Sequence, residues 1–363
     1  MPSNRVTLRA VAAAAGVHFS TASLALSDSP KLPKATRERI QAIATELGYK
    51  QDAALAALNA YRKVKQNATF QATLAIVTNH PKPDGWRVYV TGAESYTGMQ
   101  SQASKLGYNL EEFSVANGET DFRVLNRTLT ARNISGIIAV PMLQPHARIE
   151  LDWHKFSAIA LGFSMDYPSL HRVASAHLRN TERCMNHLYK LGYRRVGLAM
   201  LRQVHERVAR LHGAGYDTTI RLYPEMARIP FFTPSDYDRE YTPEALASWI
   251  RRYRIDAVMT SHQGDLLNFL PKAGIRIPED IGVINLAAAG TGIAETGIHE
   301  SNEQIGRTAI NLLVGMLHRD ERGVPRTPIQ TLVDGDWVEG NTLREQVAAS
   351  KKAKAKGENV DVK

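Results

Sequence analysis

The sequence contains a single cysteine, Cys184, among its 363 residues. No disulfide can therefore form within one chain, and this cysteine usage is typical of a reducing cytoplasm. Nowhere do about 18 apolar residues follow one another, as a membrane-spanning helix requires, and the first residues contain no apolar signal region. We therefore expect a cytoplasmic protein that is neither secreted nor inserted in a membrane.

Signatures of catalysis and of metal binding are also missing. The sequence has no HExxH, CxxC or GxSxG pattern, and its 12 histidines are scattered along the chain. His205 and Glu206 are neighbours, but we expect them at a surface or a ligand contact rather than as an acid–base pair. The sequence therefore indicates no catalytic residue, no metal ion and no cofactor.

Positive charge is concentrated near the N-terminus. The formal net charge of the chain is +9, and residues 1–66 carry ten Lys or Arg side chains against four Asp or Glu, a net charge of +6. Basic segments attract polyanions, although a mild excess over a whole chain is not specific. The distribution favours a polyanionic partner for the first fifth of the chain.

Residues 6–49 contain three helical patterns. The first is an i, i+3, i+4, i+7 apolar repeat that starts at Leu8 and stops at Gly16. The second extends from His18 to Ser27, and the third from Ala35 to Leu47. Two short helices joined by a tight glycine-containing turn, with a third helix behind them, form a helix-turn-helix unit. Its second helix would lie in the major groove of DNA.

Short apolar runs then alternate with helical patterns, first from about Thr73 to Leu161 and again from Thr181 to Val333. This alternation is typical of βαβ units around parallel sheets. We expect an α/β fold with two successive lobes, one long helix from His205 to Leu222, and a strand from Ala227 to Phe232. Ligands of such sheets bind beyond the carboxyl ends of the strands, so the cleft between the lobes is the expected site.

Several segments resemble the lactose-repressor (LacI) family of transcriptional regulators. VTLxxVAxxAGV, ST at the head of the second helix, TRERI and ELGY resemble its DNA-binding headpiece. HLxxLGYRRV, IPEDIGV and NxxxIGxxA resemble later motifs of the same family in the same order, and the resemblance covers about residues 5–344. It implies an N-terminal helix-turn-helix headpiece followed by a two-lobed, periplasmic-binding-protein-like domain with parallel sheets.

The resemblance also implies a domain order. Residues 1–50 would form the DNA-binding domain, residues 51–72 a hinge helix and linker, and residues 73–344 the effector-binding and dimerisation domain. Residues 345–363, rich in lysine, are expected to be a disordered basic tail.

The implied function is regulation of transcription, most often repression. A homodimer would bind the two half-sites of a pseudo-palindromic double-stranded operator. A small-molecule effector, expected to be a sugar or a related metabolite, would bind between the lobes and change operator affinity. Two alternatives stay open: a constitutive DNA-binding regulator without an effector, and an enzyme that uses the cleft.

Candidate DNA contacts divide into phosphate and base contacts. Hydroxyl, ammonium and guanidinium groups suit phosphates, and the candidates are Thr7, Thr21, Ser23, Lys34, Thr36 and Arg37. Alignment with the family places base-reading positions at His18, Phe19, Ser20 and Leu24. Leu24 stands where the family pattern has an arginine, so it could contact a thymine methyl group or fold back into the core. Leu58 of the hinge helix would enter the minor groove, or would instead pack the hinge on the headpiece.

Candidate effector contacts follow the same alignment. They are Asn79, His80 and, as a stacking partner, Trp86; then Arg207 and Arg210; and finally His262 and Gln263. Spacing does not tell Arg207 and Arg210 apart. A later aspartate position of the family falls within residues 286–289, which contain no acid. Because carboxylates commonly bind sugar hydroxyls, the cleft departs here from a standard sugar site.

Overall fold

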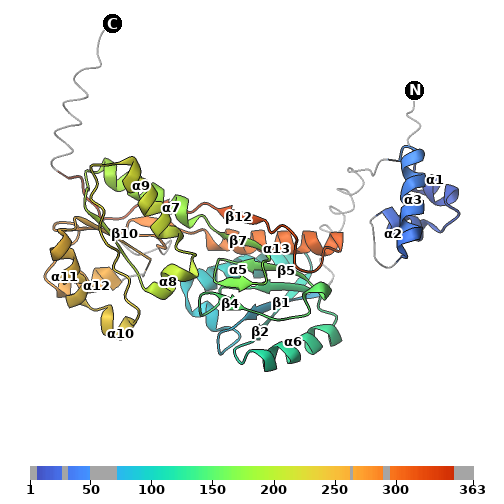
Figure 1. Ribbon diagram of the computed structural model, residues 1–363, viewed down its shortest axis with the longest axis horizontal. Coiled ribbons are helices and arrows are strands. Elements are labelled where there is room, and N and C mark those ends of the chain that lie inside the picture. Colours follow the sequence, from blue (N-terminus) through green and yellow to red (C-terminus); the bar gives the residue numbers. More distant parts are fainter. Residues whose placement is uncertain (1–5, 27–31, 50–71, 262–264, 289–294, 347–363) are drawn as a thin grey trace, which may run out of the picture.

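The computed structural model of the chain describes residues 6–26, 32–49, 72–261, 265–288 and 295–346 (Figure 1). The expected hinge helix with Leu58, residues 347–363 of the expected basic tail, and the pair His262 and Gln263 lie outside the described residues. Among the described helices, none is long and apolar enough to cross a membrane.

The headpiece consists of three short helices around a core of small side chains. They are α1 (Leu8–Ala14), α2 (Phe19–Leu26) and α3 (Lys34–Glu46), each within about one residue of its predicted start. Val11, Ala22 and Ile40, one from each helix, are fully buried against one another. Because alanine adds little volume, the three helix backbones can approach closely, and α2 keeps one side free for a partner.

The first lobe is built on a six-stranded parallel sheet with the order β12-β7-β5-β3-β1-β2. The strands are β1 (Ala72–Thr78), β2 (Tyr108–Ser114), β3 (Gly136–Ala139), β5 (Ser157–Leu161), β7 (His171–Ser175) and β12 (Gln330–Val333). Helices α5 (Val90–Lys105) and α13 (Asn302–Arg319) cover one face, and α6 (Glu119–Ala131) covers the other. A short pair, β4 (Ala147–Arg148) and β6 (Met165–Tyr167), and the 3-10 turns η1 (Gly85–Val88) and η2 (Trp153–Lys155) complete it.

The second lobe is built on a five-stranded sheet with the order β13-β11-β10-β9-β8. The strands β8 (Val196–Ala199), β9 (Ala257–Thr260), β10 (Gly282–Asn285) and β11 (Gly297–His299) are parallel, and β13 (Asp336–Val338) runs antiparallel to β11. Helices α7 (His177–Lys190) and α9 (Leu211–Leu222) pack on one face, α11 (Pro243–Tyr253) and α12 (Asp265–Lys272) on the other. The short helices are α8 (Arg202–Arg207) and α10 (Tyr237–Glu240). Cys184 of α7 is fully buried here, and burial raises its pKa to about 12.

The two lobes are not successive in sequence, which corrects the predicted arrangement. The described chain passes between the lobes three times, from β7 to α7, from β11 to α13 and from β12 to β13. Helix α13 and strand β12 therefore belong to the first lobe, although they follow most of the second (Figure 1). Alternation of strands and helices predicts βαβ units, but it carries no information about which sheet a given strand joins.

Two predicted elements of the second lobe are also wrong. The helix expected from His205 to Leu222 is broken into α8 and α9, with Ala209 and Arg210 in the left-handed region at φ of 52° and 60°. The break folds α8 over α9, since a Cβ on Gly213 would lie 2.8 Å from the ring of His205. The strand expected over residues 227–232 makes only one bridge, between Ala199 and Phe232, because Pro230 within it lacks an N–H.

Helices α5 and α13 cross in backbone contact through a pair of glycines. A Cβ on Gly98 would lie 2.0 Å from the carbonyl oxygen of Glu303, and a Cβ on Gly306 would lie 2.1 Å from that of Ser95. No other residue type leaves room for this approach. Helix α13 follows the point where the chain leaves the second lobe. The contact with α5 fixes this helix on the first lobe.

We expect Gly306→Ala to lower the free energy of unfolding by about 1–3 kcal/mol, because the added methyl group forces the two helices apart. The matched control is Gly315→Ala in the same helix, where the methyl group would meet only the end of the Arg319 side chain, at 3.1 Å. Alanine favours helix there, so stability should be unchanged or higher by up to about 1 kcal/mol. Urea unfolding followed by circular dichroism measures both; equal losses would refute the close-approach explanation.

Candidate functional site

The start of α2 presents the predicted base-reading residues to solvent. His18, Phe19 and Ser20 are exposed, and the phenyl ring of Phe19 is unusually open for an apolar side chain, at 48%. The Nδ1 of His18 lies 2.8 Å from the hydroxyl of Ser20, so the two side chains are held together. Leu24, one turn further along α2, is partly buried. An exposed aromatic ring at a helix start is unfavourable in water and suits a partner that covers it.

The predicted phosphate contacts are placed less uniformly. The Oγ of Thr7 accepts a hydrogen bond from the backbone N–H of Ala10 and so caps α1, which leaves the hydroxyl proton free to donate. Lys34 is exposed, and Arg37 donates from Nη1 to the carbonyl oxygen of Leu32 at 2.7 Å. Thr21 and Thr36 are partly buried, and Ser23 lies within α2.

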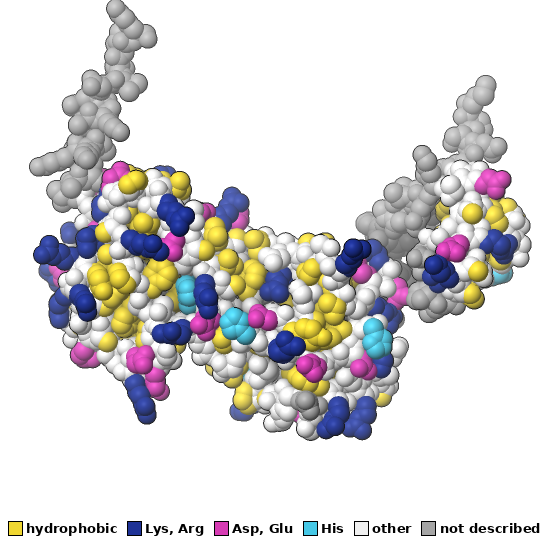
Figure 2. Space-filling model, viewed as in Figure 1, with side chains coloured by type: hydrophobic (Ala, Val, Ile, Leu, Met, Phe, Trp, Pro, Cys, Tyr) yellow, Lys and Arg dark blue, Asp and Glu magenta, His cyan; other side chains and the backbone are white. Residues whose placement is uncertain are grey.

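On the face shown in Figure 2, basic side chains of the lobes are interspersed with acidic ones and form no single patch.

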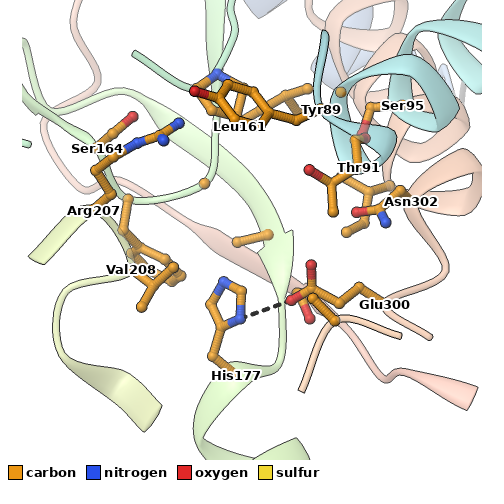
Figure 3. A pocket seen from close by; sticks show the side chains of 18 of the residues that line it. Tyr89, Thr91, Ser95, Leu161, Ser164, His177, Arg207, Val208, Glu300 and Asn302 are labelled. Carbon is orange, nitrogen blue, oxygen red and sulfur yellow. Dashed lines mark hydrogen bonds and ion pairs between the residues drawn. The ribbon is translucent and has the colours of Figure 1, made fainter. Parts of the chain in front are cut away.

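A cavity of about 250 Å³ lies between the lobes, at the carboxyl ends of strands from both sheets. Most of its wall is apolar or aromatic, with a small number of polar side chains that point inward (Figure 3). The first lobe contributes His80, Trp86, Tyr89, Thr91, Gly92, Ser95, Pro141, Leu161, Gly162, Phe163, Ser164, Ala174, Ser175, Asn302 and Ile305. The second lobe and the crossing segments contribute His177, Val204, Arg207, Val208, His212, Ser261, Ala287 and Glu300. A ligand here would contact both lobes at once.

Trp86 forms a fixed part of the wall. Its side chain is 2% exposed, and its Nε1–H donates to the carboxylate of Glu112 at 2.9 Å. A Cβ on Gly92 would lie 2.2 Å from the carbonyl oxygen of Trp86, so η1 and α5 are in backbone contact. The indole is therefore positioned by the first lobe before any ligand arrives.

The break between α8 and α9 separates the two candidate arginines. On one continuous helix Arg207 and Arg210 would share a face. In the structure Arg207 lines the cavity, whereas the side chain of Arg210 is 66% exposed and lies 3.7 Å from Glu206. The Nε of Arg207 is buried and has no hydrogen-bond partner within the described part of the chain. Burial lowers the pKa of this guanidinium below its ordinary value, because the surroundings disfavour its charge.

His80 is buried beside this arginine. Burial, and then the positive charge of Arg207, lower the pKa of its imidazole. Its Nε2 has no hydrogen-bond partner among the described residues, and its ring meets that of Tyr89 edge-on, with 6.4 Å between centroids. His80 is therefore neutral near pH 7 and leaves a polar atom in the wall for a ligand to meet.

A second group of polar side chains lies where the chain crosses between the lobes. Nδ1 of His177 is 3.0 Å from the carboxylate of Glu300, and each side chain is 9% exposed (Figure 3). Thr181 donates its hydroxyl proton to the carbonyl oxygen of His177, so it can only accept from Nδ1 of His212 at 2.9 Å. His212 thus carries its proton on Nδ1, and burial holds its pKa well below the ordinary value, so the ring is neutral.

The remaining predicted effector residues are not brought together. Oδ1 of Asn79 accepts from the backbone N–H of Leu143 at 2.7 Å, and Asn79 does not line the cavity. His262 and Gln263 lie outside the described residues, next to Ser261, whose buried Oγ has no partner in the described structure. The family pattern has an acid within residues 286–289, and from this stretch Ala287 lines the cavity.

The lining residues Tyr89, His177, His212 and Glu300 are absent from the sequence prediction. His177 and Glu300 stand at the crossings between the lobes, and the alternation of elements does not reveal those crossings. The signal that the sequence offered was a histidine or a glutamate beside a strand end. Only the fold shows that these strand ends face one cavity.

Two known protein families match the chain. "Bacterial regulatory proteins, lacI family" matches residues 7–52, and "Periplasmic binding protein-like domain" matches residues 185–342. The chain belongs to the LacI family. It is a DNA-binding regulator of transcription, and the enzyme alternative is set aside on this ground.

Similar proteins and solved structures match this chain over most of its length. The transcriptional repressor PurR of Haemophilus influenzae (strain Rd) is 24% identical over 339 residues, 87% of this chain and 92% of that protein. The regulator CelR in complex with cellobiose shares 20% identity at a TM-score of 0.56 and covers 93% of this chain and 100% of its own. The lac repressor dimer bound to operator and the anti-inducer ONPF shares 18% identity at a TM-score of 0.56, with 94% and 100% covered. These structures establish the shared fold.

We expect Phe19→Ala to weaken binding to a selected operator by about 1–3 kcal/mol, the usual magnitude of a base contact, and to leave nonspecific binding nearly unchanged. Lys34→Ala is the control, since removal of a phosphate-binding ammonium group should weaken both modes equally and reduce the salt slope by about one. Fluorescence anisotropy at several salt concentrations, on DNA selected from random sequences, measures both. An equal loss of specific and nonspecific affinity in Phe19→Ala would contradict a base-reading role.

Proposed function

We propose that this chain is a homodimeric repressor that binds a pseudo-palindromic operator through α2 and releases or tightens it when an effector fills the interlobe cavity. The observation that carries the proposal is the cavity itself. It is lined from both lobes and contains polar atoms without partners in the described structure, on Arg207, His80 and Ser261. Buried polar groups without partners are costly, so a cavity that keeps them is suited to a ligand that satisfies them.

The crossing segments provide the movable element of the proposal. The lobes are joined at the three crossings and also touch through Gln203 of α8, whose Nε2 donates to the carbonyl oxygen of Leu143 at 2.9 Å. A ligand that contacts both lobes favours one lobe arrangement over another by its difference in affinity for the two. The first lobe follows the linker to the headpiece in sequence, so a change in lobe arrangement would reach the spacing of the two headpieces in a dimer.

At the operator, His18, Phe19 and Ser20 would meet base edges, and Lys34 and Arg37 would meet phosphates. Leu24 would contact a thymine methyl group if the helix approaches closely enough. Leu58 remains the proposed minor-groove residue of the hinge helix. Binding to chromosomal DNA implies a cytoplasmic protein.

The proposed effector is a sugar or a sugar-related metabolite. CelR is described with cellobiose, and it shares the fold of this chain over nearly its whole length. The cavity of about 250 Å³ suits a compact ligand. The second candidate function, constitutive DNA binding without an effector, is motivated by the altered cleft residues, among them residues 286–289, which contain no acid. The formed cavity favours the effector-controlled alternative.

We expect Val204→Trp to abolish the response to the effector while operator affinity without effector stays within about threefold, since the indole would fill the cavity from α8 and touch no DNA-binding residue. Val324→Trp is the control: its side chain is 47% exposed, and it does not line the cavity. A screen of metabolites for shifts in operator affinity, repeated on both variants, makes the comparison. If no compound shifts the wild-type protein, constitutive binding is the better description; if Val204→Trp responds normally, the effector binds elsewhere.

A further inference from the structure

Arg207 is a cation at the cavity wall, and the described residues place no anion beside it. Its guanidinium lines the cavity, and no carboxylate of the described residues lies within ion-pair distance of it. The neighbouring carboxylate of Glu206 lies 3.7 Å from Arg210 instead. The nearest aromatic contact is the ring of Tyr89, whose centroid is 6.0 Å from the guanidinium carbon. A desolvated guanidinium is unfavourable unless a carboxylate or a phosphate accepts hydrogen bonds from its N–H groups.

The other titratable groups of the cavity leave this charge uncompensated. The imidazoles of His80 and His212 have pKa values lowered by burial, so both are neutral. Glu300 is the acid in the wall, and it lies 3.0 Å from His177 (Figure 3). In the same view Arg207 lies at the upper left of the pocket, near Ser164, and the pair lies at its lower edge. Among the described residues, the wall therefore contains a guanidinium without a carboxylate beside it, and a carboxylate, that of Glu300, that lies beside His177 instead.

We infer that the effector carries an anionic group, a carboxylate or a phosphate ester, and that this group binds to Arg207. The inference rests on the proposed function and narrows the class of its effector to a sugar acid, a sugar phosphate or a compound of the same charge. Neutral sugars are commonly held by carboxylates that accept their hydroxyl protons, and the carboxylate that the described wall contains, that of Glu300, lies 3.0 Å from His177. The buried Oγ of Ser261, without a partner in the described structure, supplies a further donor for an anion.

The apolar wall fits the same conclusion. Leu161, Phe163, Val204 and Val208 make a large part of the cavity wall apolar. Beside such a surface a charged hydrogen bond is stronger than in bulk water, because the local dielectric is lower. One arginine in an apolar cavity therefore discriminates sharply between an acid and its neutral analogue.

The first experiment needs no ligand. We expect Arg207→Gln to leave the thermal midpoint of the ligand-free protein unchanged or to raise it by about 2 °C, because a desolvated charge without a partner is removed. Arg202→Gln, an exposed arginine at the start of the same helix, is the matched control and should leave the midpoint unchanged. A large fall in the midpoint of Arg207→Gln, or failure to fold, would overturn the inference, since it would show that the guanidinium has a structural partner.

The second experiment uses anions. Inorganic phosphate, titrated at constant ionic strength, should raise the thermal midpoint of the wild-type protein and of Arg202→Gln but not that of Arg207→Gln. Glucose, glucuronate and glucose 6-phosphate then compare one carbon skeleton with and without charge. We expect an acid to bind more tightly than glucose, and Arg207→Gln to weaken that acid by about 30-fold or more, the usual effect of removing one partner of a buried charge pair. The preferred acid identifies carboxylate or phosphate.

The outcomes separate this inference from the proposed function. Equal binding of acid and neutral compound, no stabilisation by phosphate, or unchanged binding of the acid by Arg207→Gln would overturn the anion site. An acid that binds through Arg207 but leaves operator affinity unchanged would support the anion site and refute control by the cavity. A neutral compound that controls operator affinity equally well in Arg207→Gln would support control by the cavity and refute the anion site.

Discussion

The close crossing of α5 and α13 is the constraint on which the rest of the molecule depends. Gly98 and Gly306 let two backbones approach to a distance that no side chain permits, and this fixes α13 on the first lobe immediately after the chain leaves the second. The same crossing places Glu300 and Asn302 in the wall of the cavity, opposite residues of α8. The cavity thus depends on the path of the chain between the lobes, and the headpiece needs only its own small core to present α2.

The electrostatics of the cavity follow from burial. His80 and His212 lose their charge because the surroundings disfavour it, and the carboxylate of Glu300 lies 3.0 Å from Nδ1 of His177. Arg207 cannot lose its proton near neutral pH, and in the described part of the chain no carboxylate lies within ion-pair distance of it. Such a charge destabilises the ligand-free protein. A ligand that neutralises the charge and contacts both lobes therefore favours one lobe arrangement over the other.

Sequence reasoning reaches the local structure and misses the long-range connections. The headpiece helices are predictable to within about one residue at their starts, because apolar spacing and Gly16 are local signals. The assignment of α13 and β12 to the first lobe is not predictable, since a strand reads the same in either sheet. Spacing cannot separate Arg207 from Arg210, because the left-handed residues that break the helix are Ala209 and Arg210, types that favour helix. Glu300 escapes prediction because the sequence does not show which sheet a strand joins. Leu58, His262 and Gln263 lie outside the described residues.

The central claim is that the cavity and the operator are coupled sites of one equilibrium. Coupling of this kind is reciprocal: the factor by which the effector changes operator affinity must equal the factor by which the operator changes effector affinity. Titration calorimetry of the effector, into the free protein and into its operator complex, measures the second factor directly. The account predicts two different dissociation constants, whose ratio equals that found for operator binding with and without effector. Identical effector affinity for the free protein and the operator complex would contradict it.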